Sequence, residues 1–290
     1  MYTMRPAEFE YHRPASLDEA ISLLGQNEEA QPLAGGHSLL PMMKLRLAMP
    51  AALVDLRGIP GLDEISGNGG GLTIGGMATH AAVAGSEVAI GIAPVIPETA
   101  AGIGDPQVRN CGTIGGSVAH ADPGADYPTL LKALGATITA AGGNGERELS
   151  ADDFFRGIFE TALEPGELVT SVRVPATPAG TGAAYVKHRH PASGYTVVGV
   201  AAVVSVEGGK CTAARLTVGG VTAPPVHATA AADSLTGGPG SEDAIAAAAE
   251  KVPESIPHAI GDAYASAEYR THLAKVLAAR ALRKAFERAA

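Results

Sequence analysis

One glycine- and proline-rich stretch in the first half of the chain constrains its fold more than any other feature. Residues 102–128 read GIGDPQVRNCGTIGGSVAHADPGADYP and contain six glycines, three aspartates and three prolines. This composition has no long apolar run and no alternating charge, so it predicts a mostly ordered loop. Two adjacent glycines at its centre follow a short β-like beginning, where backbone N–H groups can approach a ligand closely. We therefore expect the stretch to bind an extended anion such as a pyrophosphate.

Gly-Gly pairs follow three predicted strand ends in this half of the chain. They are Gly35-Gly36, Gly75-Gly76 and Gly115-Gly116, and the last two lie in the similar runs TIGGMATH and TIGGSVAH. Taken singly, each pair is explained by a tight turn. Small hydrogen-bonding residues beside two of the pairs favour a joint role, in which two loops hold one phosphate group from two sides. These flanking residues are His37, Ser38, Thr113 and Ser117.

The familiar nucleotide-binding motifs are absent from the sequence. No GxGxxG run and no GxxxxGK[ST] run occurs. A dinucleotide would therefore be held by another architecture, with glycine loops from separate regions rather than one helix N-terminus.

Three residues outside the glycine loops are candidate ligand contacts, and each has an alternative structural explanation. Asp126 can accept hydrogen bonds from ribose hydroxyls, or it can cap the apolar helix that follows it. Lys187 belongs to the basic run KHRH, which is also typical of a solvated strand end. Tyr195 can stack on a flat cofactor, or it can be an ordinary half-buried tyrosine.

Other chemistries find little support in the sequence. His120, Asp122 and Asp126 match no strong metal-binding spacing, and no Ser/His/Asp or Cys/His pair suits nucleophilic catalysis. Cys111 and Cys211 lie far apart, so the chain cannot hold an iron–sulfur cluster alone. We expect no catalytic side chain and no metal ligand on this chain.

Turn and strand signals divide the chain into three predicted regions. Residues 1–57 form a small α/β unit, whose first helix begins with the capping box of Ser16 and Glu19 and stops at Gly25. Residues 58–176 alternate short strands and helices and include a hairpin at a Gly-Gly-Asn-Gly turn. Residues 177–290 follow a Pro/Gly linker. Their elements are strands over 183–187, 196–206 and 210–220, then helices over 241–251 and 262–287.

Charge and hydropathy limit the partners and the location. The net charge of −9 argues against nucleic-acid binding. No apolar run is long enough to span a bilayer, and the N-terminus lacks the apolar centre of a signal peptide. We expect a cytoplasmic protein without a transmembrane segment, which partners can bring to the inner face of the membrane.

Four runs resemble a known family over nearly the whole chain. They are AGGHSLLPMMKLRLAMP at 34–50, IGDPQVRNCGTIGG at 103–116 with its DPGAD continuation, LEPGELVTSVRVP at 163–175 and AEYRTHLAKVLAARAL at 267–282. The chain resembles the FAD-binding medium subunits of molybdenum hydroxylases, in particular those of the aerobic carbon monoxide dehydrogenase type. The resemblance implies an α+β fold of the vanillyl-alcohol-oxidase type, with two FAD-binding subdomains. A C-terminal three-stranded sheet with a helical bundle completes it.

The same resemblance implies which residues bind the FAD. Two backbone runs would bind the pyrophosphate. Asp126 would lie at the ribose end of the FAD, and Lys187 and Tyr195 would lie near the flavin ring. The residues of the two runs are Ala34, Gly35, Gly36, His37, Ser38, Thr113, Ile114, Gly115, Gly116 and Ser117. Ser117 replaces the Asp or Asn often found there, and His120 replaces a smaller or amide residue.

The implied activity is that of an oxidoreductase subunit in a larger complex. A large subunit with a molybdenum-cytosine dinucleotide oxidises the substrate, and a small subunit with two [2Fe–2S] clusters passes the electrons to FAD on this chain. The FAD then reduces an external acceptor such as a quinone, in a dimer of heterotrimers. The alternatives are a stand-alone FAD oxidase or reductase, or the medium subunit of a hydroxylase that acts on N-heterocycles, purines or aldehydes.

Overall fold

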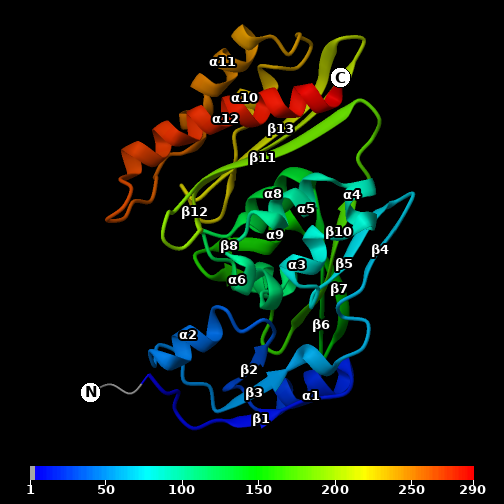
Figure 1. Ribbon diagram of the computed structural model, residues 1–290, viewed down its shortest axis with the longest axis vertical. Helices are drawn as coiled ribbons and strands as arrows, with labels where there is room; N and C mark the ends of the chain where they lie inside the picture. The colour runs from blue at the N-terminus through cyan, green and yellow to red at the C-terminus, as the bar shows by residue number, and fades with distance from the viewer. Residues whose placement is uncertain (1–3) are drawn as a thin grey trace.

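The computed structural model describes residues 4–290, so residues 1–3 of the predicted first region lie outside it. Three layers follow one another along the long axis of the molecule (Figure 1). The first is a parallel sheet in the order β1-β3-β2, with α1 packed against it. Its elements are β1 Glu10–His12, α1 Leu17–Gln26, β2 Ala30–Leu33, α2 Leu39–Lys44 and β3 Ala52–Asp55.

The start of α1 is confirmed and its predicted end is wrong by a residue. The Ser16 hydroxyl accepts the Glu19 amide, and the Glu19 carboxylate accepts the Ala15 amide, so two otherwise unpaired N–H groups find partners. Gly25 lies inside the last turn, and Asn27 is the C-cap.

The second layer is an antiparallel sheet in the order β4-β5-β10-β6-β7. Its predicted hairpin is present as β6 and β7, which meet at Gly142 and Gly145. The strands are β4 Ile65–Asn68, β5 Gly71–Gly75, β6 Thr137–Gly142, β7 Gly145–Ser150 and β10 Leu168–Pro175, with a separate pair β8 Phe155–Gly157 and β9 Glu160–Thr161. The helices are α3 His80–Ala84, α4 Glu87–Ile92, α5 Val95–Ala101, α6 Pro106–Cys111, α7 Ile114–His120, α8 Asp126–Leu134 and α9 Ala151–Phe154.

The glycine- and proline-rich stretch is largely helical, so the prediction of an ordered loop is wrong. Asp105 caps α6 by accepting the Val108 amide, and Thr113 caps α7 by accepting the Gly116 amide. These caps start helices too short to show an apolar period in the sequence. Asp126 is the first residue of α8 rather than its cap, because Ala125 holds that position.

The third layer is a sheet in the order β11-β12-β13-β14, covered by helices on one face (Figure 1). A fourth strand of two residues extends the three that were predicted, and α12 begins at Ala267, later than expected, with Ser266 as its cap. The elements are β11 Thr181–Arg189, β12 Thr196–Glu207, β13 Lys210–Gly219, β14 Val226–His227, α10 Thr229–Asp233, α11 Glu242–Glu250 and α12 Ala267–Ala289.

The third sheet packs against other elements on both faces. Successive side chains of a strand point to opposite faces, so alternate residues of β12 enter different cores. Along β12, Val200 and Ala202 pack in the core that contains α12, whereas Ala201 belongs to the core of the second layer. Helix α8 contacts β12 and β13 from that second side. Among the described residues, no helix combines the length and apolarity needed to cross a bilayer.

Candidate functional site

A long cleft runs between the first and second layers and extends to the third. Its volume is about 1350 Å³. The lining comes from five segments that are distant in sequence. They lie within residues 24–56, 76–80, 103–126, 163–169 and 193–195.

The first glycine run forms the turn between β2 and α2 and offers free backbone donors. The amides of Gly35, Gly36, His37 and Ser38 donate no hydrogen bond within residues 4–290. Gly36 has φ +71°, a left-handed conformation that suits glycine. Because four consecutive N–H groups lack partners beside the cleft, this turn can bind an anion.

The first and second glycine runs lie close together. The backbone at Cys111 and Gly112 approaches Gly35 so closely that this position must be glycine. A Cβ on Gly35 would lie 2.3 Å from the Cys111 carbonyl oxygen, and one on Gly116 would lie 3.6 Å from the Ala34 Cβ. The structure therefore places the two predicted runs side by side, as the sequence suggested.

Four of the five amides of the second run are already used within the chain. The Ile114 amide donates to the Ala78 carbonyl at 3.0 Å, and the Gly115 amide donates to the Gly76 carbonyl at 2.9 Å. The amides of Gly116 and Ser117 donate to the Thr113 hydroxyl and carbonyl oxygens. Among residues 4–290, the free donors are therefore the four amides of the first run and the amide of Thr113. Gly115-Gly116 opens a helix instead of ending a strand.

The two TIGG runs of the sequence pack on each other. Their glycines Gly76 and Gly115 are in contact, and the amide of His80 donates to the Gly112 carbonyl at 2.9 Å. This contact places the His80 ring beside the cleft, 95% buried, with no hydrogen-bond partner for Nδ1 among the described residues. Burial, with smaller effects of His37 and Arg109, lowers the pKa of His80 to about 4. The ring is therefore neutral near pH 7.

His80 is a site residue that was missed at the sequence level. The matching histidines that end TIGGMATH and TIGGSVAH were the available signal.

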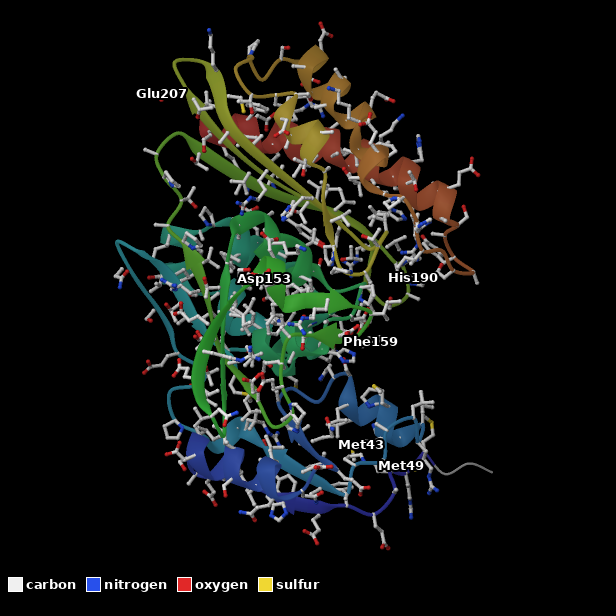
Figure 2. The ribbon with its side chains drawn as sticks, turned by 180° about the vertical axis from the view of Figure 1, so that it is seen from behind. Met43, Met49, Asp153, Phe159, His190 and Glu207 are labelled. Carbon is white, nitrogen blue, oxygen red and sulfur yellow. The ribbon has the colours of Figure 1, made fainter. Side chains whose placement is uncertain are left out.

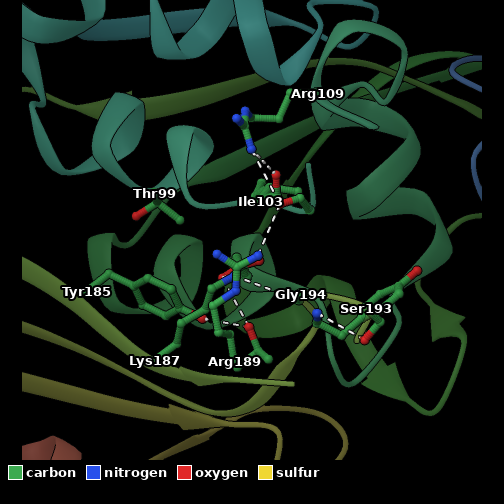
Figure 3. Close-up of polar contacts among 12 residues, drawn as sticks. Thr99, Ile103, Arg109, Tyr185, Lys187, Arg189, Ser193 and Gly194 are labelled. Carbon is green, nitrogen blue, oxygen red and sulfur yellow. Dashed lines mark hydrogen bonds and ion pairs between the residues drawn. The ribbon is translucent and has the colours of Figure 1, made fainter. Parts of the chain in front are cut away.

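Asp126 and Lys187 form a buried ion pair at the end of the cleft that the third layer closes. Their carboxylate and ammonium groups lie 2.7 Å apart, and the Thr196 hydroxyl donates to the same carboxylate at 3.0 Å. Burial raises the pKa of the Asp126 carboxyl, while Lys187 and Thr196 oppose the rise. The Tyr185 ring lies beside this pair, and Figure 3 shows it with Lys187.

Tyr195 projects from a tightly bonded turn between β11 and β12. Nδ1 of His190 accepts hydrogen bonds from the amides of Ala192 and Ser193. The His190 amide donates to the Tyr195 carbonyl at 2.7 Å. The Tyr195 side chain lines the cleft and is 47% exposed. Burial of its hydroxyl and the nearby Asp122 raise the pKa of Tyr195.

Two arginines fix the backbone that faces this turn, a feature that the sequence did not reveal. Arg109 donates to the Ile103 carbonyl at 2.9 Å, and Arg189 donates to the Gly104 carbonyl at 3.3 Å (Figure 3). Both Ile103 and Gly104 line the cleft. The third layer is thereby tied to the second at this end of the cleft.

Taken together, the predicted site residues converge on one cleft. All of them line it except Ile114, which is buried behind the wall, and Lys187, which reaches it through Asp126. Among residues 4–290, no group of three or more His, Cys, Asp or Glu side chains is placed to hold a metal ion. Free amides in the turn after β2, close glycine contacts and a buried ion pair at the far end fit an elongated anionic ligand such as a dinucleotide.

Comparisons with known proteins agree with this geometry. Residues 7–177 match the family model described as the FAD binding domain in molybdopterin dehydrogenase. Residues 183–285 match the CO dehydrogenase flavoprotein C-terminal domain. The chain is 42% identical to the carbon monoxide dehydrogenase medium chain of Afipia carboxidovorans, covering 99% of each.

Solved structures show the same fold. A chain of reconstituted CO dehydrogenase from Oligotropha carboxidovorans superposes with a TM-score of 0.93 at 42% identity, covering 98% of this chain and 99% of that one. A chain of quinoline 2-oxidoreductase from Pseudomonas putida 86 gives 0.94 at 38% identity, with the same coverage.

Proposed function

The chain belongs to the FAD-binding medium subunits of the molybdenum hydroxylases, of the carbon monoxide dehydrogenase type, and from that premise we propose how it works. It binds FAD in the cleft between its first two layers. The FAD takes electrons from [2Fe–2S] clusters of a partner subunit and passes them to an external acceptor such as a quinone. When bound, the flavin supplies the exchange between one-electron donors and a two-electron acceptor.

The observation that supports this proposal best is the run of unpartnered amides after β2. A pyrophosphate placed there accepts hydrogen bonds from Gly35 to Ser38. The second run contributes its closeness to the first, since Gly116 lies against Ala34, and among residues 4–290 the Thr113 amide is its one donor without an acceptor.

The remaining predicted residues act at the end of the cleft that the third layer closes. We assign Asp126 to the ribose or ribityl hydroxyls, with Lys187 holding the carboxylate ionised. Tyr195 offers its ring as a stacking surface for the flavin. The unpartnered Nδ1 of His80 is a further hydrogen-bonding atom available to the ligand.

The names of relatives support the proposed partners and the proposed substrate of the complex. Relatives similar along their whole length are medium chains or subunits of dehydrogenases named for carbon monoxide and for 6-hydroxypseudooxynicotine. We propose a large molybdenum-binding subunit and a small iron–sulfur subunit as partners, in a cytoplasmic dimer of heterotrimers. Carbon monoxide is the proposed substrate of the complex, because the carbon monoxide dehydrogenase chains are more similar than the nicotine-type one.

The experiment that tests the proposed function compares FAD affinity in two glycine variants. Gly35→Ala pushes a Cβ against the Cys111 carbonyl and should misalign the free amides. Losing two charge-assisted hydrogen bonds of about 1.5 kcal/mol each weakens FAD binding by about a hundredfold. Gly143→Ala places its new Cβ more than 4 Å from other atoms of residues 4–290 and serves as the control.

FAD affinity is measured by flavin fluorescence on the complex purified with its companion chains. Equal affinity in both variants would rule out the turn after β2 as the pyrophosphate site. Absence of FAD from the wild-type complex would contradict the proposed function itself.

A further inference from the structure

A second hollow adjoins the cleft at Tyr195. Its volume is about 600 Å³, which is in the range of small-molecule sites. Asp122, Gly124, Ser193 and Tyr195 line both spaces and form a common wall. Any group bound in the hollow is therefore separated from the cleft by little more than this tyrosine and its neighbours.

The outer rim of the hollow carries an exposed apolar tip. Ile158 and Phe159, in the turn between β8 and β9, are 58% and 57% exposed. Phe159 has φ +55°, a conformation that costs energy for a residue with a side chain. The His120 ring packs on Phe159 at 4.8 Å between centroids, and Figure 2 shows Phe159 on the same side of the molecule as His190. Exposed apolar residues held in a strained turn indicate a surface that binds something apolar.

The charges around the hollow exclude an anionic ligand. Among the described residues, Arg270 is the one Arg or Lys in its lining. Its guanidinium already donates to the Val197 and Gly220 carbonyls and to Asp262. Within residues 4–290, Asp122 has no cationic partner within ion-pair distance. A phosphate or carboxylate bound here would meet acidic groups with no available positive charge.

A neutral hydrogen-bond donor is nevertheless available. Because Nδ1 of His190 accepts two amides, the hydrogen of the neutral ring lies on Nε2. His190 lines the hollow, and its Nε2 has no hydrogen-bond partner among the described residues. The lining thus includes apolar side chains, the Tyr195 ring, and in His190 an N–H group of a kind that suits a carbonyl oxygen.

We propose that this hollow binds the planar, uncharged head group of a quinone, the external electron acceptor. The inference rests on the proposed function, because it requires FAD in the neighbouring cleft as the electron donor. Two electrons pass across the wall that contains Tyr195, and the two quinone carbonyl oxygens take up two protons to give the quinol. A reduced flavin bound in the cleft would supply these two electrons and two protons.

The test uses the holoenzyme complex and a head group without a tail, 2,3-dimethoxy-5-methyl-1,4-benzoquinone. Ile158→Ser removes an apolar wall, and Ile90→Ser changes a similarly exposed isoleucine on α4 as a matched control. Phe159→Gly removes the ring and suits the positive φ, so folding is retained. Two quantities are measured: the Kd of the oxidised enzyme by calorimetry, and the rate at which the quinone reoxidises the reduced flavin.

We expect Kd for the quinone to rise about tenfold in Ile158→Ser and Phe159→Gly and to stay unchanged in Ile90→Ser. Flavin content and the reoxidation rate with ferricyanide, a hydrophilic acceptor, should match the wild type. Unchanged quinone Kd in both hollow variants, or loss of a companion subunit from them, would overturn the inference while the proposed function stands. A wild-type complex that holds FAD but does not bind the quinone would also overturn it.

Discussion

Burial and neighbouring charges act on individual side chains in the cleft. His80 is held neutral beside the glycine runs, and Asp126 is held next to Lys187 under the third layer. Both residues link elements that are distant in sequence. Each should therefore report on the integrity of the cleft when its charge or its partner is changed.

His80 makes stability depend on pH in a definite direction. Its pKa is 6.5 in the unfolded chain and about 4 in the folded one, so between these values the unfolded state binds more protons. The free energy of unfolding therefore falls as the pH falls, by about 2 kcal/mol from pH 7 to pH 5. In His80→Gln this part of the fall is removed, as denaturant titrations at the two pH values will measure. His258→Gln, which changes an exposed imidazole, is the control; an identical pH dependence in the His80 variant would contradict the account.

The Asp126–Lys187 pair should behave as a coupled unit. Asp126→Asn leaves a buried ammonium without its counter-charge and lowers the free energy of unfolding by about 3 kcal/mol. Adding Lys187→Met removes that charge, so the double variant regains part of the loss. Urea denaturation of the singles and the double forms a double-mutant cycle. Additive losses would show that the two groups are not coupled.

At the scale of elements, the cleft depends on two similar turns pressed together. Gly76 follows β5 and Gly115 lies in the first turn of α7, and their backbones share a hydrogen bond. This contact holds α7 against the second sheet and brings the second glycine run next to the first. Any side chain at the contact must separate the elements.

Gly115→Ala should therefore be costly, although it is a small change. The new Cβ would lie 2.6 Å from the Gly76 carbonyl oxygen, and we expect a loss of about 3 kcal/mol in the free energy of unfolding. Gly91→Ala lies within α4, and no atom of the described residues lies within 4 Å of its new Cβ. It should instead raise the free energy of unfolding by about 0.5 to 1 kcal/mol. Thermal and denaturant unfolding of the two variants measure both values. A neutral Gly115→Ala would show that the two turns can move apart freely.

Elements with strong local signals were predictable, and elements defined by tertiary contacts were not. The cap at Ser16 and the hairpin turn at Gly142 to Gly145 are specified by residues close together in the sequence, and both are present. Helices α6 and α7 are too short to show a period, so glycine and proline content suggested a loop. The glycine runs could be located from sequence, but which of their amides stay free depends on the contact between Gly76 and Gly115. The position of His80 depends on the same contact.

At the scale of the whole molecule, the third layer packs directly against the second and is not joined to it by a linker alone. Ala183, Tyr185 and Ala201 of the third sheet belong to the core around α8. Glu98 on α5 pairs with Arg288 on α12 across the same boundary. The turn that carries Tyr195 is thus placed over the cleft by a continuous core.

This shared core predicts how the chain unfolds. The predicted regions 58–176 and 177–290 should melt in one cooperative transition, because separating them would expose the contacts of α8 with β12 and β13 and the buried Ala201. Scanning calorimetry of the purified chain checks this expectation. Two separate transitions would favour independent domains at the predicted boundary.

The account rests on FAD in the cleft with its pyrophosphate on the turn after β2, and a structure of the FAD-loaded complex tests this most directly. We predict phosphate oxygens about 3 Å from the amide nitrogens of Gly36 and His37, with the flavin ring beside Tyr195. A pyrophosphate bound elsewhere, with the amides of residues 35–38 facing only solvent, would contradict it.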